Sequence, residues 1–156
     1  MKQSNRYCGR ICTALLCAMF LVIWGNSALP GDTSGDISGG IMAWLTELVG
    51  GPLSFGELVL RKLAHFTEFT LLGLLLAWRF LLWGQKGIHR FTMPLLCGNL
   101  AALMDETIQV FVPGRGPSPI DIWIDTAGVA TGITILLVGC AIDQRKKTNH
   151  IGGKEL

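Results

Sequence analysis

The stretch from Asp105 to Asp125 reads DETIQVFVPGRGPSPIDIWID and decides how the rest of the chain is interpreted. It begins inside one apolar run and ends inside another, and the segment between them contains three prolines, two glycines and one arginine. Four carboxylates lie in it, those of Asp105, Glu106, Asp121 and Asp125. Ionisable side chains are costly in such apolar surroundings, so they indicate a functional site by default.

Along the whole chain, the apolar residues gather in long blocks. The chain has 156 residues, of which 50% are hydrophobic and only 15% are charged. Four blocks approach the length of about 20 residues that crosses a bilayer. They are Ile11–Leu29, Leu63–Leu82, Phe91–Val112 and Ile120–Ile142. A soluble helix bundle is the alternative, but too little polar sequence remains to coat one. We therefore predict an all-α, polytopic membrane protein with four transmembrane helices.

The basic residues predict how these helices are oriented. If the N-terminus is cytoplasmic, four crossings leave Arg61, Lys62 and Arg115 on the outer side and the other ten of the 13 basic residues on the inner side. Cytoplasmic segments carry an excess of Lys and Arg. We therefore expect a multi-pass protein with both termini in the cytoplasm. It divides into a basic cytoplasmic tail at 1–10, a membrane domain at 11–142 and a cytoplasmic tail at 143–156.

Three segments beside the blocks carry further expectations. The first block resembles a signal peptide, but Asn26 is larger than the residue that cleavage prefers, so we favour a retained helix. The outer segment at 30–53 begins with Gly, Ser and Asp, which predicts a loop. Apolar residues then recur at helical spacing, which predicts a short amphipathic helix on the outer surface with Trp44 among the headgroups. The polar tail from Asp143 is predicted to be irregular.

Polar side chains are predicted to converge in the outer third of the bundle. Arg61, His65 and Glu68 are spaced four and three residues apart, so they share one helix face. Asp121 and Asp125 lie on the same side of the last helix as Gly128 and Gly132, a pair of small residues typical of a packed face, so both carboxylates are expected to point inward. The candidate binding residues are Arg61, Lys62, His65, Glu68, Asp105, Glu106, Gln109, Arg115, Asp121 and Asp125.

This set combines five acids with three permanent cations and one histidine, and three interpretations are open. Buried charges must be paired or neutralised, so some acids must pair with Arg61 or Arg115, share protons or bind a cation. In the first interpretation, the charges only hold the helices together, and the protein is purely structural or an interaction partner. In the second, the basic residues bind an anionic lipid headgroup or a lipid-linked phosphate.

In the third interpretation, the protein is a membrane-embedded enzyme that acts on a lipid-linked substrate. Glu68, Asp105 and Glu106 are then the candidate catalytic acids and bases, and His65 is a base or a metal ligand. A catalytic zinc usually takes more than one histidine, and only His65 lies on this side. We therefore predict no metal and no other cofactor, with His65 as the single weak metal candidate.

Three stretches resemble the VanZ-like family of small bacterial integral membrane proteins. They read WGNSALPGDTSGDISGGI, RKLAHFTEFTLLGLLL and MDETIQVFVPGRGPSPIDIWIDTAGVATG. The family pattern marks Lys62, His65, Glu68, Asp105, Glu106, Gln109, Pro113, Gly114, Arg115, Asp121, Asp125 and Gly128. The first stretch matches loosely. The family is named for a member linked to low-level resistance to the glycopeptide teicoplanin, and it supplies no reaction.

This resemblance implies a cell-envelope protein in the bacterial cytoplasmic membrane. We expect its outer-leaflet polar pocket to bind an anionic lipid headgroup, a lipid-linked cell-wall precursor or a similar amphiphile. An effect on teicoplanin susceptibility is a further expectation from the family name. The expected partners are therefore membrane lipids and not nucleic acid, and a homo-oligomer is compatible with the same features.

Overall fold

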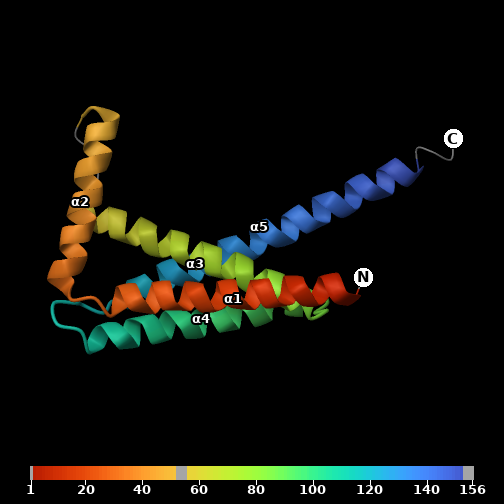
Figure 1. The fold of residues 1–156 in the computed structure, drawn as a ribbon, viewed down its shortest axis with the longest axis horizontal. Coiled ribbons are helices and arrows are strands. Elements are labelled where there is room, and N and C mark those ends of the chain that lie inside the picture. Colours follow the sequence, from red (N-terminus) through yellow and green to blue (C-terminus); the bar gives the residue numbers. More distant parts are fainter. Residues whose placement is uncertain (1, 52–55, 153–156) are drawn as a thin grey trace.

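The computed structural model describes residues 2–51 and 56–152, and five α-helices make up its regular structure (Figure 1). In chain order they are α1 Lys2–Ser27, α2 Gly31–Val49, α3 Glu57–Leu82, α4 His89–Val110 and α5 Pro119–Gly152. No strand occurs in these two described ranges. The all-α prediction is therefore confirmed.

Four of the helices pack side by side, and α2 runs across them at one end (Figure 1). Helix α3 lies at the centre, because it contacts α1, α2, α4 and α5 and packs most extensively against α5. Every helix of this bundle contributes to the buried apolar core. The core residues are Cys12, Leu16, Ile23, Phe69, Leu72, Leu76, Ala77, Ala101, Ala102, Val129 and Ile133.

Small residues allow α5 to approach the backbone of α3 closely. A Cβ atom added to Gly132 would lie 2.0 Å from the carbonyl oxygen of Thr70, and one added to Gly128 would lie 2.6 Å from that of Phe66. Such close packing through small residues is a common device of membrane helices. The predicted packing face is confirmed, and Asp125 lies on it with no exposed surface. The fold therefore turns this carboxylate inward.

Among the described residues, three helical segments are long and apolar enough to cross a membrane, namely Arg6–Ser27, Glu57–Leu82 and Pro119–Lys146. Helix α4 is not among them, because Asn99, Asp105, Glu106 and Gln109 interrupt its apolar sequence. Large apolar side chains are nevertheless exposed on every helix, and Leu21, Phe111 and Trp123 are each at least 74% exposed. The structure thus supports a membrane protein with three candidate spans, whereas the fourth span stays a prediction.

The predicted loop at the beginning of the outer segment is wrong, because α2 begins at Gly31 and continues for 19 residues. Pro30 lies just before the helix, and the backbone N–H of Gly31 donates to the carbonyl of Pro113. A Cβ at Gly31 would lie 2.0 Å from the carbonyl oxygen of Gly114. Turn-forming residues therefore serve here to dock the start of α2 against the α4–α5 loop.

The predicted irregular C-terminal tail is also wrong, since α5 continues as a helix to Gly152. No glycine or proline lies between Asp143 and Ile151, so nothing in this polar sequence stops the helix. Helix α1 likewise begins at Lys2, within the basic segment at 1–10. The polar segments near the two ends of the chain thus continue α1 and α5 as helix beyond their apolar parts.

Candidate functional site

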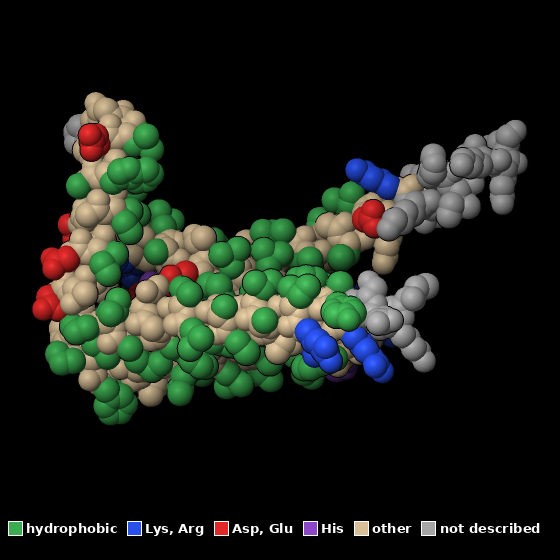
Figure 2. All heavy atoms as spheres, viewed as in Figure 1, with side chains coloured by type: hydrophobic (Ala, Val, Ile, Leu, Met, Phe, Trp, Pro, Cys, Tyr) green, Lys and Arg blue, Asp and Glu red, His purple; other side chains and the backbone are tan. Residues whose placement is uncertain are grey.

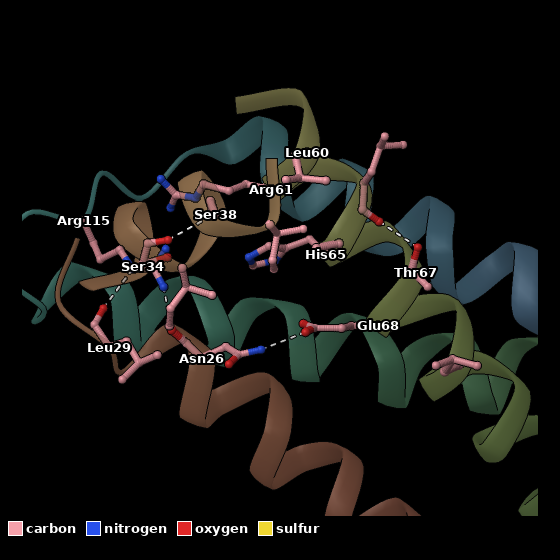
Figure 3. Close-up of a pocket in the computed structure, with 15 residues that line it drawn as sticks. Asn26, Leu29, Ser34, Ser38, Leu60, Arg61, His65, Thr67, Glu68 and Arg115 are labelled. Carbon is pink, nitrogen blue, oxygen red and sulfur yellow. Dashed lines mark hydrogen bonds between the residues drawn. The ribbon is translucent and has the colours of Figure 1, made fainter. Parts of the chain in front are cut away.

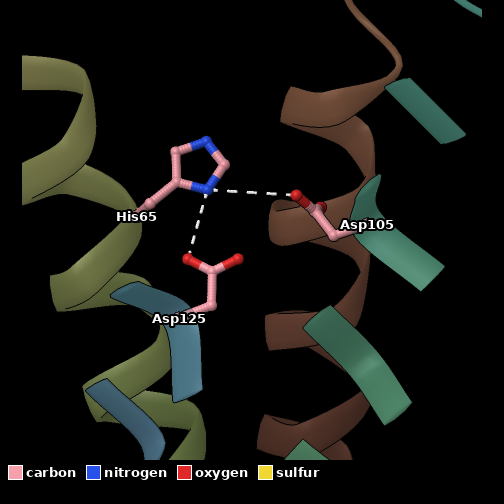
Figure 4. A group of neighbouring side chains, drawn as sticks. All are labelled: His65, Asp105 and Asp125. Carbon is pink, nitrogen blue, oxygen red and sulfur yellow. Dashed lines mark ion pairs between the residues drawn. The ribbon is translucent and has the colours of Figure 1, made fainter. Parts of the chain in front are cut away.

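The side chains of His65, Asp105 and Asp125 converge from three helices, α3, α4 and α5 (Figure 4). The Nδ1 atom of His65 lies 3.6 Å from Oδ1 of Asp125 and 3.9 Å from Oδ2 of Asp105. Both carboxylates are fully buried, whereas the histidine side chain is 20% exposed. One potential ligand atom from each residue lies within 4.8 Å of the others, which is close enough for one metal ion.

The two carboxylates differ sharply in their hydrogen bonds. Ser27 at the end of α1 donates its hydroxyl to Oδ1 of Asp105 at 2.5 Å, and the amide of Gln109 donates to Oδ2 at 3.1 Å. The same amide lies 3.4 Å from the hydroxyl of Ser27. Asp125 receives none of this support, because neither of its buried oxygens has a hydrogen-bond partner among the described residues.

Three further acids surround this cluster, each with a partner of its own. Glu68 accepts a hydrogen bond of 2.8 Å from the amide of Asn26. Glu106 accepts one of 2.9 Å from the backbone N–H of Ser118, while its second oxygen has no partner among the described residues. Asp121 forms an ion pair with Lys62, and both side chains are partly exposed. These contacts fix the acids on α3, α4 and α5 in separate positions.

Arg115 ties the α4–α5 loop to the end of α1. Its guanidinium donates to the backbone carbonyls of Leu29, at 3.1 Å, and of Asn26. These carbonyls lie at the end of α1, where backbone acceptors lack partners within the helix. Burial and the neighbouring positive charge of Arg61 lower the pKa of Arg115 from its usual value. The two guanidinium groups therefore concentrate positive charge at this end of the bundle.

Two cavities open beside the cluster. The larger, of about 520 Å³, lies between α2 and α3, and Figure 3 shows Arg61 and His65 extending into it from α3. Its walls are mostly apolar, with Ile37 and Ile41 on α2 and Leu60 on α3 among the lining residues. The smaller cavity, of about 300 Å³, reaches Lys62, Gln109 and Asp121. Arg61 and His65 line both cavities.

The residues that build this arrangement fall within one known sequence family. The model of the VanZ/LLP1 family matches residues 12–140. The chain belongs to the VanZ/LLP1 family. The resemblance found in the sequence is therefore confirmed, and the matched range includes the His65–Asp105–Asp125 cluster and both ends of the α4–α5 loop. No curated protein and no solved structure gave a significant match to the chain.

Within this VanZ/LLP1 region, the structure places the ten predicted binding residues at the end of the bundle that carries α2, but in distinct surroundings. His65, Asp105 and Asp125 form the centre, and Gln109 supports them. The remaining residues lie around this centre or line the two cavities. Of the three ways in which the acids could be balanced, pairing with Arg61 or Arg115 is not seen among the described residues. Arg115 instead binds backbone carbonyls, and Asp121 pairs with Lys62.

Two contributors were missing from the sequence-based site, Asn26 and Ser27 on α1. They bind Glu68 and Asp105, which lie 42 and 78 residues further along the chain. The signal that could have found them is their position, because these two polar residues directly follow the apolar run of α1. Ser27 is fully buried, which such a residue tolerates only with a hydrogen-bond partner.

Proposed function

We propose that the chain crosses the bacterial cytoplasmic membrane four times with both termini in the cytoplasm. In Figure 2, most of the visible Lys and Arg side chains lie toward the end of the bundle that holds the termini, and acidic side chains gather at the α2 end. Hydrophobic side chains cover the surface between them. This distribution agrees with the excess of basic residues in cytoplasmic segments.

Helix α4 supports a fourth crossing despite its polar residues. The helix contains 22 residues. At about 1.5 Å per residue it spans about 33 Å, which matches a hydrocarbon core of about 30 Å. Asp105, Glu106 and Gln109 are buried in the bundle, whereas Leu96 and Leu100 are exposed. Average hydropathy counts the buried and exposed residues alike, although only the exposed ones would meet lipid.

Helix α2 is proposed to lie along the outer membrane surface. It runs across the direction of α1 and α4, as a helix in the membrane plane would run across membrane-spanning helices (Figure 1). Ile37, Ile41, Trp44 and Leu48 are between 46% and 68% exposed, so apolar surface is free for lipid contact. An apolar face with an aromatic residue is typical of interfacial helices.

We propose that the larger cavity binds an amphiphile with an anionic headgroup, either a membrane lipid or a lipid-linked cell-wall precursor. The observation that carries this proposal is Arg61, which is half-buried in the cavity and has neither an ion pair nor a hydrogen bond with any described residue. A guanidinium group in this state is suited to a phosphate. The apolar faces of α2 and α3 beside it would accommodate acyl chain.

The test is the identity of the lipids that accompany the protein purified in mild detergent. We expect anionic lipid to be enriched over the membrane average and to be lost from Arg61→Glu. The control is Lys86→Glu, which reverses one exposed charge in the α3–α4 turn far from the cavity. Charge reversal at Arg115 is a less suitable test, because this side chain also binds the backbone at the end of α1. Equal anionic lipid in wild type and Arg61→Glu would overturn the proposal.

A change in teicoplanin susceptibility is the proposed phenotype, and it rests on the family name alone. It is measured as growth inhibition in cells that express wild type or Arg61→Glu at equal levels. If headgroup binding underlies the phenotype, only the wild type shifts susceptibility. An equal shift in cells that express either chain would show that the phenotype does not depend on Arg61.

A second candidate function is turnover of the bound lipid. The observation that favours it is His65, which lines both cavities and lies beside the carboxylates of Asp105 and Asp125. A partly exposed imidazole next to buried carboxylates is a typical acid–base arrangement. The test is mass spectrometry of lipid incubated with wild type and with His65→Gln. Products made only by the wild type, while both chains retain lipid, would favour an enzyme.

A further inference from the structure

The buried carboxylate of Asp125 lacks a hydrogen-bond partner in the described chain, and lipid binding in the larger cavity does not explain this. Its carboxylate is fully buried between helices, and neither oxygen has a hydrogen-bond partner among the described residues. The Nδ1 atom of His65, which faces it, also has none. Buried polar groups are nearly always hydrogen-bonded, and an exception is explained by a bound water or ion, by strain or by a catalytic role. A species that accepts lone pairs from both the Asp125 carboxylate and Nδ1 of His65 would satisfy these buried atoms.

The distances within the cluster fit a metal ion better than direct contact. The separations from Nδ1 of His65 to the two carboxylates are 3.6 Å and 3.9 Å. Both are too long for hydrogen bonds. Two ligand atoms bound tetrahedrally to one zinc ion, each at roughly 2.0–2.2 Å, lie about 3.3–3.6 Å apart. Both interactions converge on the same nitrogen, as Figure 4 shows. Small side-chain adjustments would therefore place one ion between the three residues.

Charge and hydrogen bonding point to the same conclusion. A neutral histidine with two ionised aspartates carries two negative charges in a buried position, which a divalent cation would neutralise. The carboxylate of Asp105 also accepts hydrogen bonds from Ser27 and Gln109, in the way that carboxylate ligands are oriented by a surrounding hydrogen-bond shell. His65 borders both cavities, so a further coordination position could face a cavity.

From this geometry we infer that His65, Asp105 and Asp125 bind one divalent cation of the zinc class. A set of one imidazole and two carboxylates suits Zn²⁺ and its neighbours in the first transition series, whereas Mg²⁺ and Ca²⁺ prefer oxygen ligands alone. The sequence alone predicted no metal because only one histidine lies at this end. The fold supplies the other two ligands from α4 and α5. This inference does not depend on lipid binding.

The test uses full-length protein in detergent, stripped with a chelator and dialysed against Zn²⁺. We expect one bound zinc per chain by elemental analysis, and its loss from Asp125→Asn and His65→Gln. Ser27→Ala should weaken binding by about 10–100-fold, as changes around metal ligands typically do. The matched control is Asp36→Asn, which removes an exposed acid on α2 outside the cluster and should retain the zinc.

A second measurement keeps the test decisive if Asp125→Asn fails to fold. The variant His65→Cys, loaded with Co²⁺, should gain a thiolate-to-cobalt absorption band that the wild type lacks, because residue 65 would then bind the metal through sulfur. No stoichiometric zinc in the wild type would overturn the inference. So would zinc retained equally by Asp125→Asn, or cobalt-loaded His65→Cys without the new band.

Discussion

The hydroxyl of Ser27 lies 2.5 Å from the buried carboxylate of Asp105 and donates a hydrogen bond to it. This contact joins the last residue of α1 to the α4 member of the His65–Asp105–Asp125 cluster, and both side chains are fully buried. A hydrogen bond to a charged group typically contributes about 1.5–3 kcal/mol, and a buried acceptor that loses its donor carries the desolvation cost alone. The contact therefore links the packing of α1 to the site.

We expect Ser27→Ala to lower the free energy of unfolding by about 1.5–3 kcal/mol, because it removes this donor from Asp105. The measurement is reversible unfolding in detergent micelles, followed by circular dichroism. Thr134→Ala is the control, since this exposed hydroxyl bonds only to the carbonyl of Ala130 in its own helix. It should change stability by no more than about 0.5 kcal/mol. Equal stability of Ser27→Ala and wild type would contradict the expectation.

The contact between α3 and α5 gives a second prediction. The methyl group added by Gly132→Ala would lie 2.0 Å from the carbonyl oxygen of Thr70 and would force the helices apart. This overpacking should destabilise the bundle by about 1–3 kcal/mol, which thermal unfolding in detergent measures. Gly139→Ala on the same helix meets no atom within 4 Å. It should be neutral or stabilise the helix by up to about 1 kcal/mol. Similar behaviour of the two variants would contradict close packing at Gly132.

The inward direction of Asp125 could be predicted from the sequence because it depends on local periodicity. Asp125, Gly128 and Gly132 fall on one side of a helix, and glycines at that spacing mark a packed face. The order of the helices along the chain also brings α4 and α5 together through a short loop. The helical repeat thus sufficed to place the carboxylate of Asp125 in the bundle interior, whereas Asp121 on the same predicted face remains partly exposed.

The partners of these carboxylates could not be predicted in the same way. Ser27 reaches Asp105 from a position 78 residues away in the chain. Which of the many polar side chains meets a given acid depends on the tilt and rotation of whole helices. Arg115 shows the same difficulty. Its charge suggested an ion pair with an acid, but the loop geometry places it against the backbone carbonyls at the end of α1.

Local composition also gave a wrong prediction where tertiary contacts determine the backbone conformation. Residues 31–36 contain Gly, Asp, Thr and Ser, which ordinarily predict a loop, yet they form the first turns of α2. The docking of Gly31 against Gly114 fixes where this helix begins, and the hydroxyl of Ser38 bonds back to the carbonyl of Ser34. Tertiary context of this kind routinely overrides weak helix propensity.

The proposed crossing of α4 gives the last prediction, because it places the α3–α4 turn and the α4–α5 loop on opposite sides of the membrane. Cysteines introduced by Lys86→Cys and Gly116→Cys occupy exposed positions in these two connections. With an impermeant maleimide on intact cells, we expect Gly116→Cys to react more than the unsubstituted chain. Lys86→Cys should react more than the unsubstituted chain only after the cells are permeabilised. Equal reactivity of both positions before permeabilisation would mean that α4 does not cross, and the topology would then rest on three spans.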